Sequence, residues 1–176
     1  MMRFFTRILL PILLIAAVVH AAAVWAVPRL VMHKVIQAID QHGGPNTVYH
    51  APQATAAART IPLPSPDLLY STCALDLSAG PVEVSVTPGP DYLSLAVFDA
   101  ATDNSFVTND ENAHGQPIHL LIAGPATPAP SIPQGATLVR LDTARGLLLL
   151  RGLAATPELR ARNDAARHSL VCRRQE

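Results

Sequence analysis

Aromatic residues and lysine are both scarce in this sequence. Phe, Trp and Tyr together make up 5% of the 176 residues, and Lys34 is a lone lysine, the other cationic side chains being arginine. A fold with so few aromatic rings must build its core from Val, Leu, Ile and Ala, which are abundant in the second half of the chain.

A surplus of charge of either sign is also absent. Lys and Arg total 13 and Asp and Glu total 13, so the formal net charge is zero. Binding to nucleic acid depends on an excess of Lys and Arg that neutralises phosphates. The composition therefore predicts that nucleic acid is not a partner.

No established catalytic motif is present. Ser71 lacks Gly-x-Ser-x-Gly surroundings, and no glycine-rich phosphate loop occurs. His114 and His119 have no third ligand at a metal-binding spacing, and the carboxylates between Asp99 and Glu111 do not match the twelve-residue calcium loop. The sequence therefore predicts no catalytic residue, no metal site and no cofactor.

The amino-terminal segment has the length of a membrane span. No formal charge occurs from Ile8 to Val27, and such a helix would reach roughly 30 Å, the thickness of a hydrocarbon core. Apolar residues continue at helical spacing beyond Pro28. We therefore expect residues 1–40 to form a transmembrane anchor with a helical extension, kinked where the proline falls.

A cleaved signal peptide is the competing interpretation. The small residues Ala21 to Ala23, and Val24 to Ala26, both resemble cleavage sites. The length of the apolar run favours an anchor. Arg3, Arg7 and the terminal amine before the span, against Arg29 and Lys34 after it, favour an amino terminus inside the cytoplasm by a small margin.

Residues 41–66 are rich in proline and contain a Gly-Gly-Pro breaker, so they cannot form a continuous helix. We expect an extended linker, or a strap lying on the domain that follows. From residue 67 onward, short apolar runs alternate with polar residues, as in Pro81–Val86 with its valines at every second position. Residues 67–176 are thus predicted to form a mainly β, antiparallel sandwich or jelly-roll-like domain.

The end of the chain predicts one short helix packed on the sheet. Thr156, Pro157 and Glu158 supply a capping hydroxyl, a proline at the first helical position and an early acid. Leu159 and Leu170 fall on one face of this helix. Cations up to Arg174 would lie near its carboxyl end.

Four pieces of the domain, taken in order, resemble a bacterial family known as domain of unknown function 1254. The pieces are SPDLLYSTCALDLSAGPVEVSV, YLSLAVFDAATDNSFV, LLIAGP and GLLLLRGL, and the resemblance runs from about Ser65 to Gln175. It implies a β-rich, jelly-roll-type fold and no known reaction. Longer members carry a second β domain, so this chain resembles a compact, membrane-anchored form. The resemblance leaves two alternatives open: a separately encoded sibling β domain in the same membrane is its partner, or the small form has a polar surface and acts alone.

The two cysteines are candidates for an intramolecular disulfide bond. Cys73 shares the inward face of its predicted strand with Leu75 and Leu77, and Cys172 follows the last helix. In an oxidising compartment the two can form one intramolecular bridge. The alternative is a buried thiol and a free cysteine in the tail.

These observations predict a single-pass protein of the bacterial inner membrane whose domain faces the periplasm. The favoured function is a non-enzymatic module that binds a partner or a small ligand. The alternative is a periplasmic, hydrolase-like enzyme with a pocket near Asp99 and His119. A pocket formed by Asp67, Tyr70, Asp99 and His119 would favour the enzyme.

Overall fold

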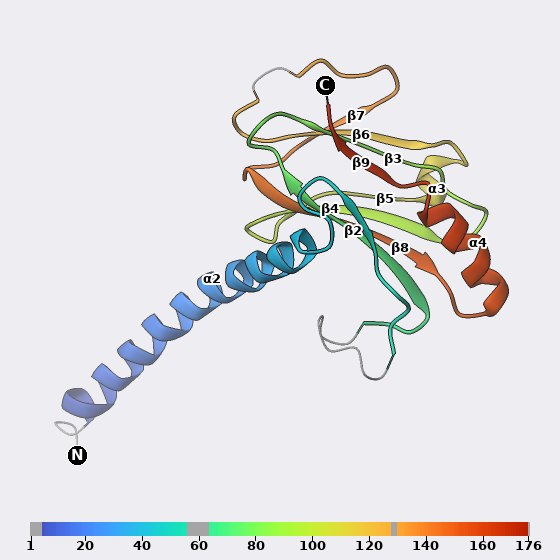
Figure 1. Cartoon of the computed structure of the whole chain (residues 1–176). Helices are drawn as coiled ribbons and strands as arrows, with labels where there is room; N and C mark the ends of the chain where they lie inside the picture. Colours follow the sequence, from blue (N-terminus) through green and yellow to red (C-terminus); the bar gives the residue numbers. More distant parts are fainter. Residues whose placement is uncertain (1–4, 56–63, 128–129, 176) are drawn as a thin grey trace.

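Two facing β-sheets and one long projecting helix make up the computed structural model, which describes residues 5–55, 64–127 and 130–175 (Figure 1). Sheet A has the strand order β1-β2-β8-β4-β5, and sheet B has the order β7-β6-β3-β9. The strands are Val48–His50 (β1), Leu68–Asp76 (β2), Val82–Val86 (β3), Leu93–Asp99 (β4), Asn104–Asn109 (β5), Ile118–Ala123 (β6), Thr137–Arg140 (β7), Arg145–Leu153 (β8) and Val171–Arg174 (β9). The predicted β-sandwich is confirmed.

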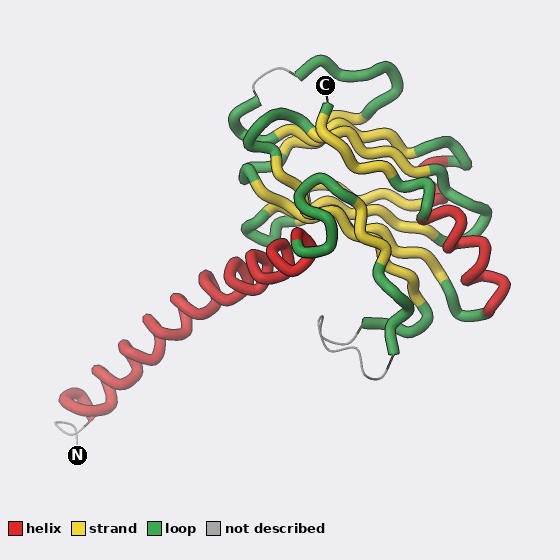
Figure 2. The backbone as a smooth tube through the Cα atoms, viewed as in Figure 1, coloured by secondary structure: helices red, strands yellow, loops and turns green. Residues whose placement is uncertain are grey.

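Figure 2 shows the strands arranged in two facing layers. Alternating side chains from these strands build the core between the layers. In β3 the three valines are buried and the two polar residues between them are partly exposed. The buried cluster consists of aliphatic side chains from both sheets together with the two cysteines. The core is therefore built mainly from Val, Leu and Ile, as the low aromatic content predicted.

All strand pairs are antiparallel except β6 and β7, which run parallel. A parallel pair requires a crossover connection, and residues 124–136 supply it. Part of this connection is fixed to the end of the chain, because Gln175 donates a hydrogen bond to the Ser131 carbonyl. The crossover explains how a mostly antiparallel sandwich contains one parallel pair.

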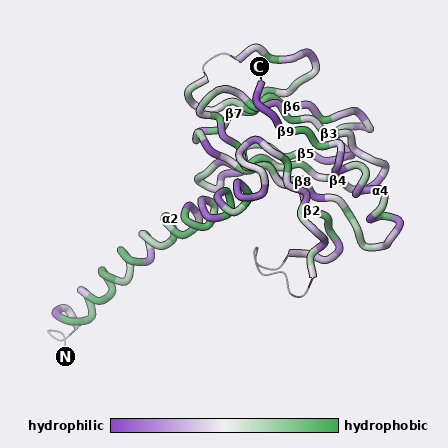
Figure 3. The backbone as a smooth tube through the Cα atoms, viewed as in Figure 1, coloured by the Kyte–Doolittle hydropathy of each residue, from purple (hydrophilic) through white to green (hydrophobic). Residues whose placement is uncertain are grey.

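The amino-terminal helix is long and apolar enough to span a membrane. It comprises a short π-helical turn, Phe5–Leu9 (η1), followed by Leu10–Asp40 (α2), and it continues through Pro28. Figure 3 shows hydrophobic residues along most of its projecting part. Most of the apolar side chains from Ile8 to Val31 are exposed, and none is buried against the rest of the described protein.

The last two turns of α2 pack on the outer face of sheet A. Ile36 and Ile39 are buried against Ala74 of β2 and Leu147 of β8. An ion-pair network closes the contact, because Arg145 bonds both Asp40 at the end of α2 and Asp76 at the end of β2. The helix that can cross the membrane is therefore also a structural part of the domain.

Part of the predicted linker belongs to the sheet. After α2, Asn46 makes two hydrogen bonds to the backbone of Asp76, and residues 48–50 then pair with β2 as the edge strand β1. The Ala51 amide extends this pairing by donating to the Tyr70 carbonyl. These contacts hold the chain against sheet A immediately after the helix ends.

The carboxyl-terminal helix starts as predicted and ends earlier. Pro157–Arg167 (α4) follows the Thr156 cap, whose hydroxyl accepts a hydrogen bond from the Leu159 amide. The expectation that Arg174 lies near the end of this helix is wrong, because residues 171–174 form β9 on the edge of β3. The acidic segment after Asp99 likewise contains β5 and a single helical turn, Asp110–Ala113 (α3).

Gly146 in β8 provides a test of the packing between the sheets. A Cβ atom there would lie 2.7 Å from the Phe98 carbonyl oxygen and 2.6 Å from Leu141 Cδ1. We expect Gly146→Ala to lower the unfolding free energy by about 1–3 kcal/mol, as overpacking does. Gly89→Ala is the control, because its Cβ would meet only Ala166 at an ordinary 3.7 Å. Equal stability of the two variants in denaturant titrations would contradict this packing.

Candidate functional site

The residues of the predicted pocket lie in different places. Asp99 ends β4 and is buried, and its Oδ1 accepts hydrogen bonds from the amides of Ala101 and Asp103 at 2.8 and 2.9 Å. This carboxylate therefore holds the turn between β4 and β5. Asp67 is exposed before β2, where its carbonyl accepts a bond from the Ala154 amide.

Strand register separates Tyr70 from Asp99. Tyr70 lies opposite Arg151, which lies opposite Ser94, and Asp99 is five residues farther along β4. That separation is roughly 17 Å along the strand. The Tyr70 hydroxyl accepts a hydrogen bond from the Ser65 amide at 3.0 Å. The structure does not bring these two residues into one pocket.

His119 lies in the other sheet. Its Nε2 is 2.8 Å from Glu83 Oε1, and Arg173 bonds the second oxygen of the same carboxylate at 3.1 Å. The hydrogen bond with His119 lowers the pKa of the Glu83 carboxyl, and Arg173 lowers it further. His119 also borders a hollow of about 160 Å³ near the edges of β5 and β7. It is therefore already paired, and Asp99 is not its partner.

The structure brings together a different cluster, the histidine junction, which consists of His50, Ser71, Asp164, Arg167 and His168. His50 Nδ1 lies 2.8 Å from the Ser71 hydroxyl, and the rings of His50 and His168 stack with their centroids 4.2 Å apart. Arg167 bonds Asp164 at 2.6 Å. Strands β1 and β2 thus meet the carboxyl end of α4 through these side chains.

Arg167 fastens the junction to the backbone. Its Nη1 donates to the carbonyls of Ala51 and Tyr70 at 2.9 and 3.0 Å. Burial lowers the pKa of His50, and the neighbouring His168 and Arg167 lower it further, while Asp164 opposes them. A hollow of about 320 Å³ adjoins the junction and is lined by Gln53, Leu69, Pro157, Arg160, Asp164 and Arg167, together with Ala161.

The Ser71–His50 pair has the hydrogen bond of a nucleophile and its base, but its position excludes that role. Ser71 is 0% exposed, so no substrate carbonyl can reach its hydroxyl. Sequence reasoning missed the junction because its members lie up to 118 residues apart and share no local motif. Within the described ranges, no group of three or more His, Cys, Asp or Glu side chains could hold a metal ion.

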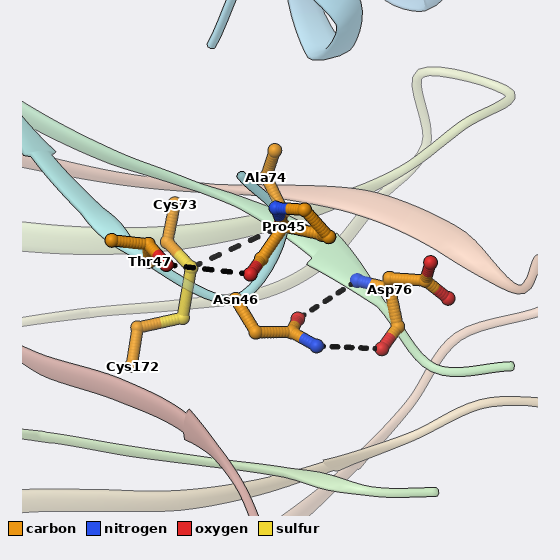
Figure 4. Close-up of a disulfide and its surroundings, with 7 residues drawn as sticks. All are labelled: Pro45, Asn46, Thr47, Cys73, Ala74, Asp76 and Cys172. Carbon is orange, nitrogen blue, oxygen red and sulfur yellow. Dashed lines mark hydrogen bonds between the residues drawn. A yellow bond between two sulfur atoms is a disulfide. The ribbon is translucent and has the colours of Figure 1, made fainter. Parts of the chain in front are cut away.

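Cys73 and Cys172 are bonded to each other in the structure (Figure 4). Their Cα atoms lie 6.6 Å apart, and 99 positions separate them in sequence. The bond joins β2 of sheet A to β9 of sheet B. It therefore ties the two layers of the sandwich together across the core.

A family model described as "Protein of unknown function (DUF1254)" matches residues 45–174. The VPA0106 protein from Vibrio parahaemolyticus has a similar fold, with a TM-score of 0.64 and 17% identity over 84% of this chain and 35% of that one. A putative uncharacterized protein from Burkholderia cenocepacia gives a TM-score of 0.47 and 15% identity over 78% and 38%. The chain thus spans little more than a third of these solved structures. No curated protein matches it.

The histidine junction predicts a loss of stability in mild acid. Because the folded-state pKa of His50 lies below the ordinary value of 6.5, protonation favours the unfolded chain. The unfolding free energy should therefore fall as the pH drops below about 6.5. Carboxylates such as Asp76 and Glu83 have lowered pKa values and lose their contribution only at lower pH.

Denaturant titrations between pH 7 and 5 measure this loss. His50→Asn should flatten the dependence of stability on pH. His114→Asn is the matched control, because His114 is exposed and has a φ of +49°, which asparagine tolerates. An unchanged pH dependence in His50→Asn would contradict the assignment.

We expect reduction of the disulfide to lower the free energy of unfolding substantially. Closing a loop of this length stabilises the folded chain by about 4–5 kcal/mol in the chain-entropy account. Replacing both cysteines by alanine, or adding a reductant, should lower the unfolding free energy by up to that amount. The reductant should have no effect on the double variant. Two thiols that react with an alkylating agent in the unreduced, unfolded protein would disprove the bond.

Proposed function

Since the chain belongs to DUF1254, a family described as proteins of unknown function, we propose a role from its own geometry: a single-span, membrane-anchored module that binds a partner or a small ligand outside the cytoplasm. The observation that carries this proposal is the continuity of α2. One helix provides the exposed apolar run and then packs Ile36 and Ile39 onto sheet A. Such a helix holds the domain at a fixed distance from a bilayer.

The exit of the span supports this arrangement. Trp25 lies near the end of the apolar run, and the Arg29 guanidinium stacks on its ring at 4.5 Å. Tryptophan and arginine suit the interface between lipid and water. The first residue of α2 buried on the domain, Ile36, comes seven positions after Arg29, which is roughly 10 Å of helix. The domain would therefore sit close to the membrane surface.

The disulfide supports a compartment outside the cytoplasm. Disulfides persist in oxidising compartments such as the bacterial periplasm and are rare in the cytosol. The Cys73–Cys172 bond is buried, as a structural bond is. Together with the slight excess of positive charge before the span, this favours an inner-membrane protein whose domain faces the periplasm.

The hydrolase-like alternative has no supporting geometry. The Asp99 carboxylate already accepts hydrogen bonds from backbone amides of its own turn. His119 is paired with Glu83, and Ser71 is buried. None of these side chains combines a free reactive group with access for a substrate. We therefore favour binding over catalysis.

A sibling β domain is the macromolecular partner that we propose. The VPA0106 protein is much longer than this chain, which covers 35% of it. Strand β5 is the last strand of sheet A on its side, and Val107 in its middle is 58% exposed. An edge strand with unpaired backbone groups is suited to pairing with another β domain. A partner anchored in the same membrane would meet this edge readily.

Protease accessibility tests the proposed topology. In a bacterial host, protease added to spheroplasts should digest the domain, while inverted membrane vesicles should protect it. The full chain should fractionate with the inner membrane, and a control chain that lacks residues 1–27 should not. A soluble mature protein beginning near Val24 or Val27, or protection in spheroplasts, would overturn the proposal.

A further inference from the structure

The hollow beside the histidine junction has the composition of a small-ligand site. Its volume of about 320 Å³ falls in the size range of small-molecule pockets. Leu69 of β2, with Pro157 and Ala161 of α4, supplies apolar walls, and three charged side chains of α4 line the same hollow. Apolar walls with a few polar groups are typical of sites that orient a small molecule.

Arg167 has unused hydrogen-bond donors at this hollow. A guanidinium carries five N–H groups. In Arg167, Nε donates to Asp164, and Nη1 donates to the carbonyls of Ala51 and Tyr70. Nη2 makes no hydrogen bond within the described residues, and it is not fully buried, so a ligand can reach it. An arginine that is only 8% exposed therefore lines the hollow with two free N–H groups.

Arg160 adds a positive charge that has no counter-charge within the described residues. Asp164, one turn farther along α4, is engaged by Arg167 at 2.6 Å. Glu158 is two positions away, and residues at that spacing do not face each other on a helix. An exposed, unpaired arginine alone indicates no site, since Arg174 of β9 also makes no ion pair within the described ranges. Arg160 differs because it lines the same hollow as the Arg167 guanidinium.

We propose that this hollow binds a small organic anion, a carboxylate or phosphate group carried on an apolar body. Two guanidinium groups and the single Asp164 carboxylate leave its lining with a surplus of positive charge. Arginine N–H groups match the oxygens of carboxylate and phosphate. The apolar body of the ligand packs on Leu69, Pro157 and Ala161. This inference rests on the proposed binding function and names the chemistry of its ligand.

The position of the hollow favours a soluble anion, although a phospholipid headgroup shares its chemistry. The end of α2 is fixed near Asp76, at one end of β2, whereas Arg167 fixes α4 to Tyr70 near the other end. Six positions of β2, roughly 20 Å, separate these two residues. Figure 1 shows α4 on the side of the domain away from the projecting helix. A membrane that held this helix would lie far from the hollow.

Thermal unfolding of the full chain in phosphatidylcholine nanodiscs tests the site with probes of matched shape. Benzoate and phenyl phosphate, titrated at constant ionic strength, should raise the melting temperature in a saturable way, because a ligand stabilises the state that binds it. Benzylammonium has the same apolar ring and the opposite charge, and it should cause no rise. Acetate lacks the apolar body and should need a higher concentration than benzoate for the same rise.

Substitutions at exposed positions of α4 test the lining and should leave the melting temperature without probe unchanged. Arg160→Gln should raise the benzoate dissociation constant by about tenfold, the usual effect of losing one hydrogen bond to a charged group. Arg174→Gln, which removes an exposed arginine from β9, should leave that constant unchanged. Ala161→Leu fills the hollow with a good helix former and should abolish the response. Ala165→Leu, at an exposed position of α4 outside the lining, should retain it.

Nanodiscs in which phosphatidylglycerol replaces part of the phosphatidylcholine separate the two sources of the anion. A soluble ligand predicts the same Arg160-dependent response to benzoate in both kinds of disc. A rise caused by phosphatidylglycerol itself and lost in Arg160→Gln would overturn the choice of a soluble ligand. Equal benzoate responses in Arg160→Gln and the unaltered chain, or no saturable response to any probe, would overturn the site. None of these results depends on which side of the membrane the domain occupies, so failure of the site and failure of the proposed topology are separate results.

Discussion

The packing of α2 on sheet A is the interaction on which the arrangement of the protein depends. Without it, Ala74, Leu147 and the partly buried Phe98 would face water on a bare sheet, and the apolar helix would end in a free segment. Burying two isoleucines contributes on the order of 2 kcal/mol each. Arg145, which bonds carboxylates from both α2 and β2, selects one position of the helix on the sheet. One contact thus covers this part of the sheet and attaches the long apolar helix to the domain.

This packing makes the long apolar helix a rigid extension of the domain. The chain is held again directly after the helix, where Asn46 bonds the backbone of Asp76 and β1 pairs with β2. The Cys73–Cys172 bond then joins sheet A to sheet B. Helix and both sheets therefore form one body.

Local patterns in the sequence predicted the parts of the fold that depend on neighbouring residues. The alternation in β3, the uncharged run of α2 and the Thr156 cap of α4 each carry their own signal. Strands β1, β5 and β9 were not predicted, because each is short and gains its stability from pairing with a partner strand distant in sequence. The candidate site was harder still to predict from the sequence. Asp99 and Tyr70 are separated by strand register, and His50 meets His168 only through the fold.

Hydrogen exchange at the backbone amides of residues 29–40, in the full chain in nanodiscs, tests most directly that α2 is continuous from its exposed apolar part to sheet A. The account predicts that these amides exchange as slowly as those of β2 and β8, because helix and sheet open together. In Arg145→Gln, exchange should rise first in the last turn, next to Asp40. Fast exchange throughout residues 29–40, with β2 and β8 still protected, would show a flexible tether and contradict the account.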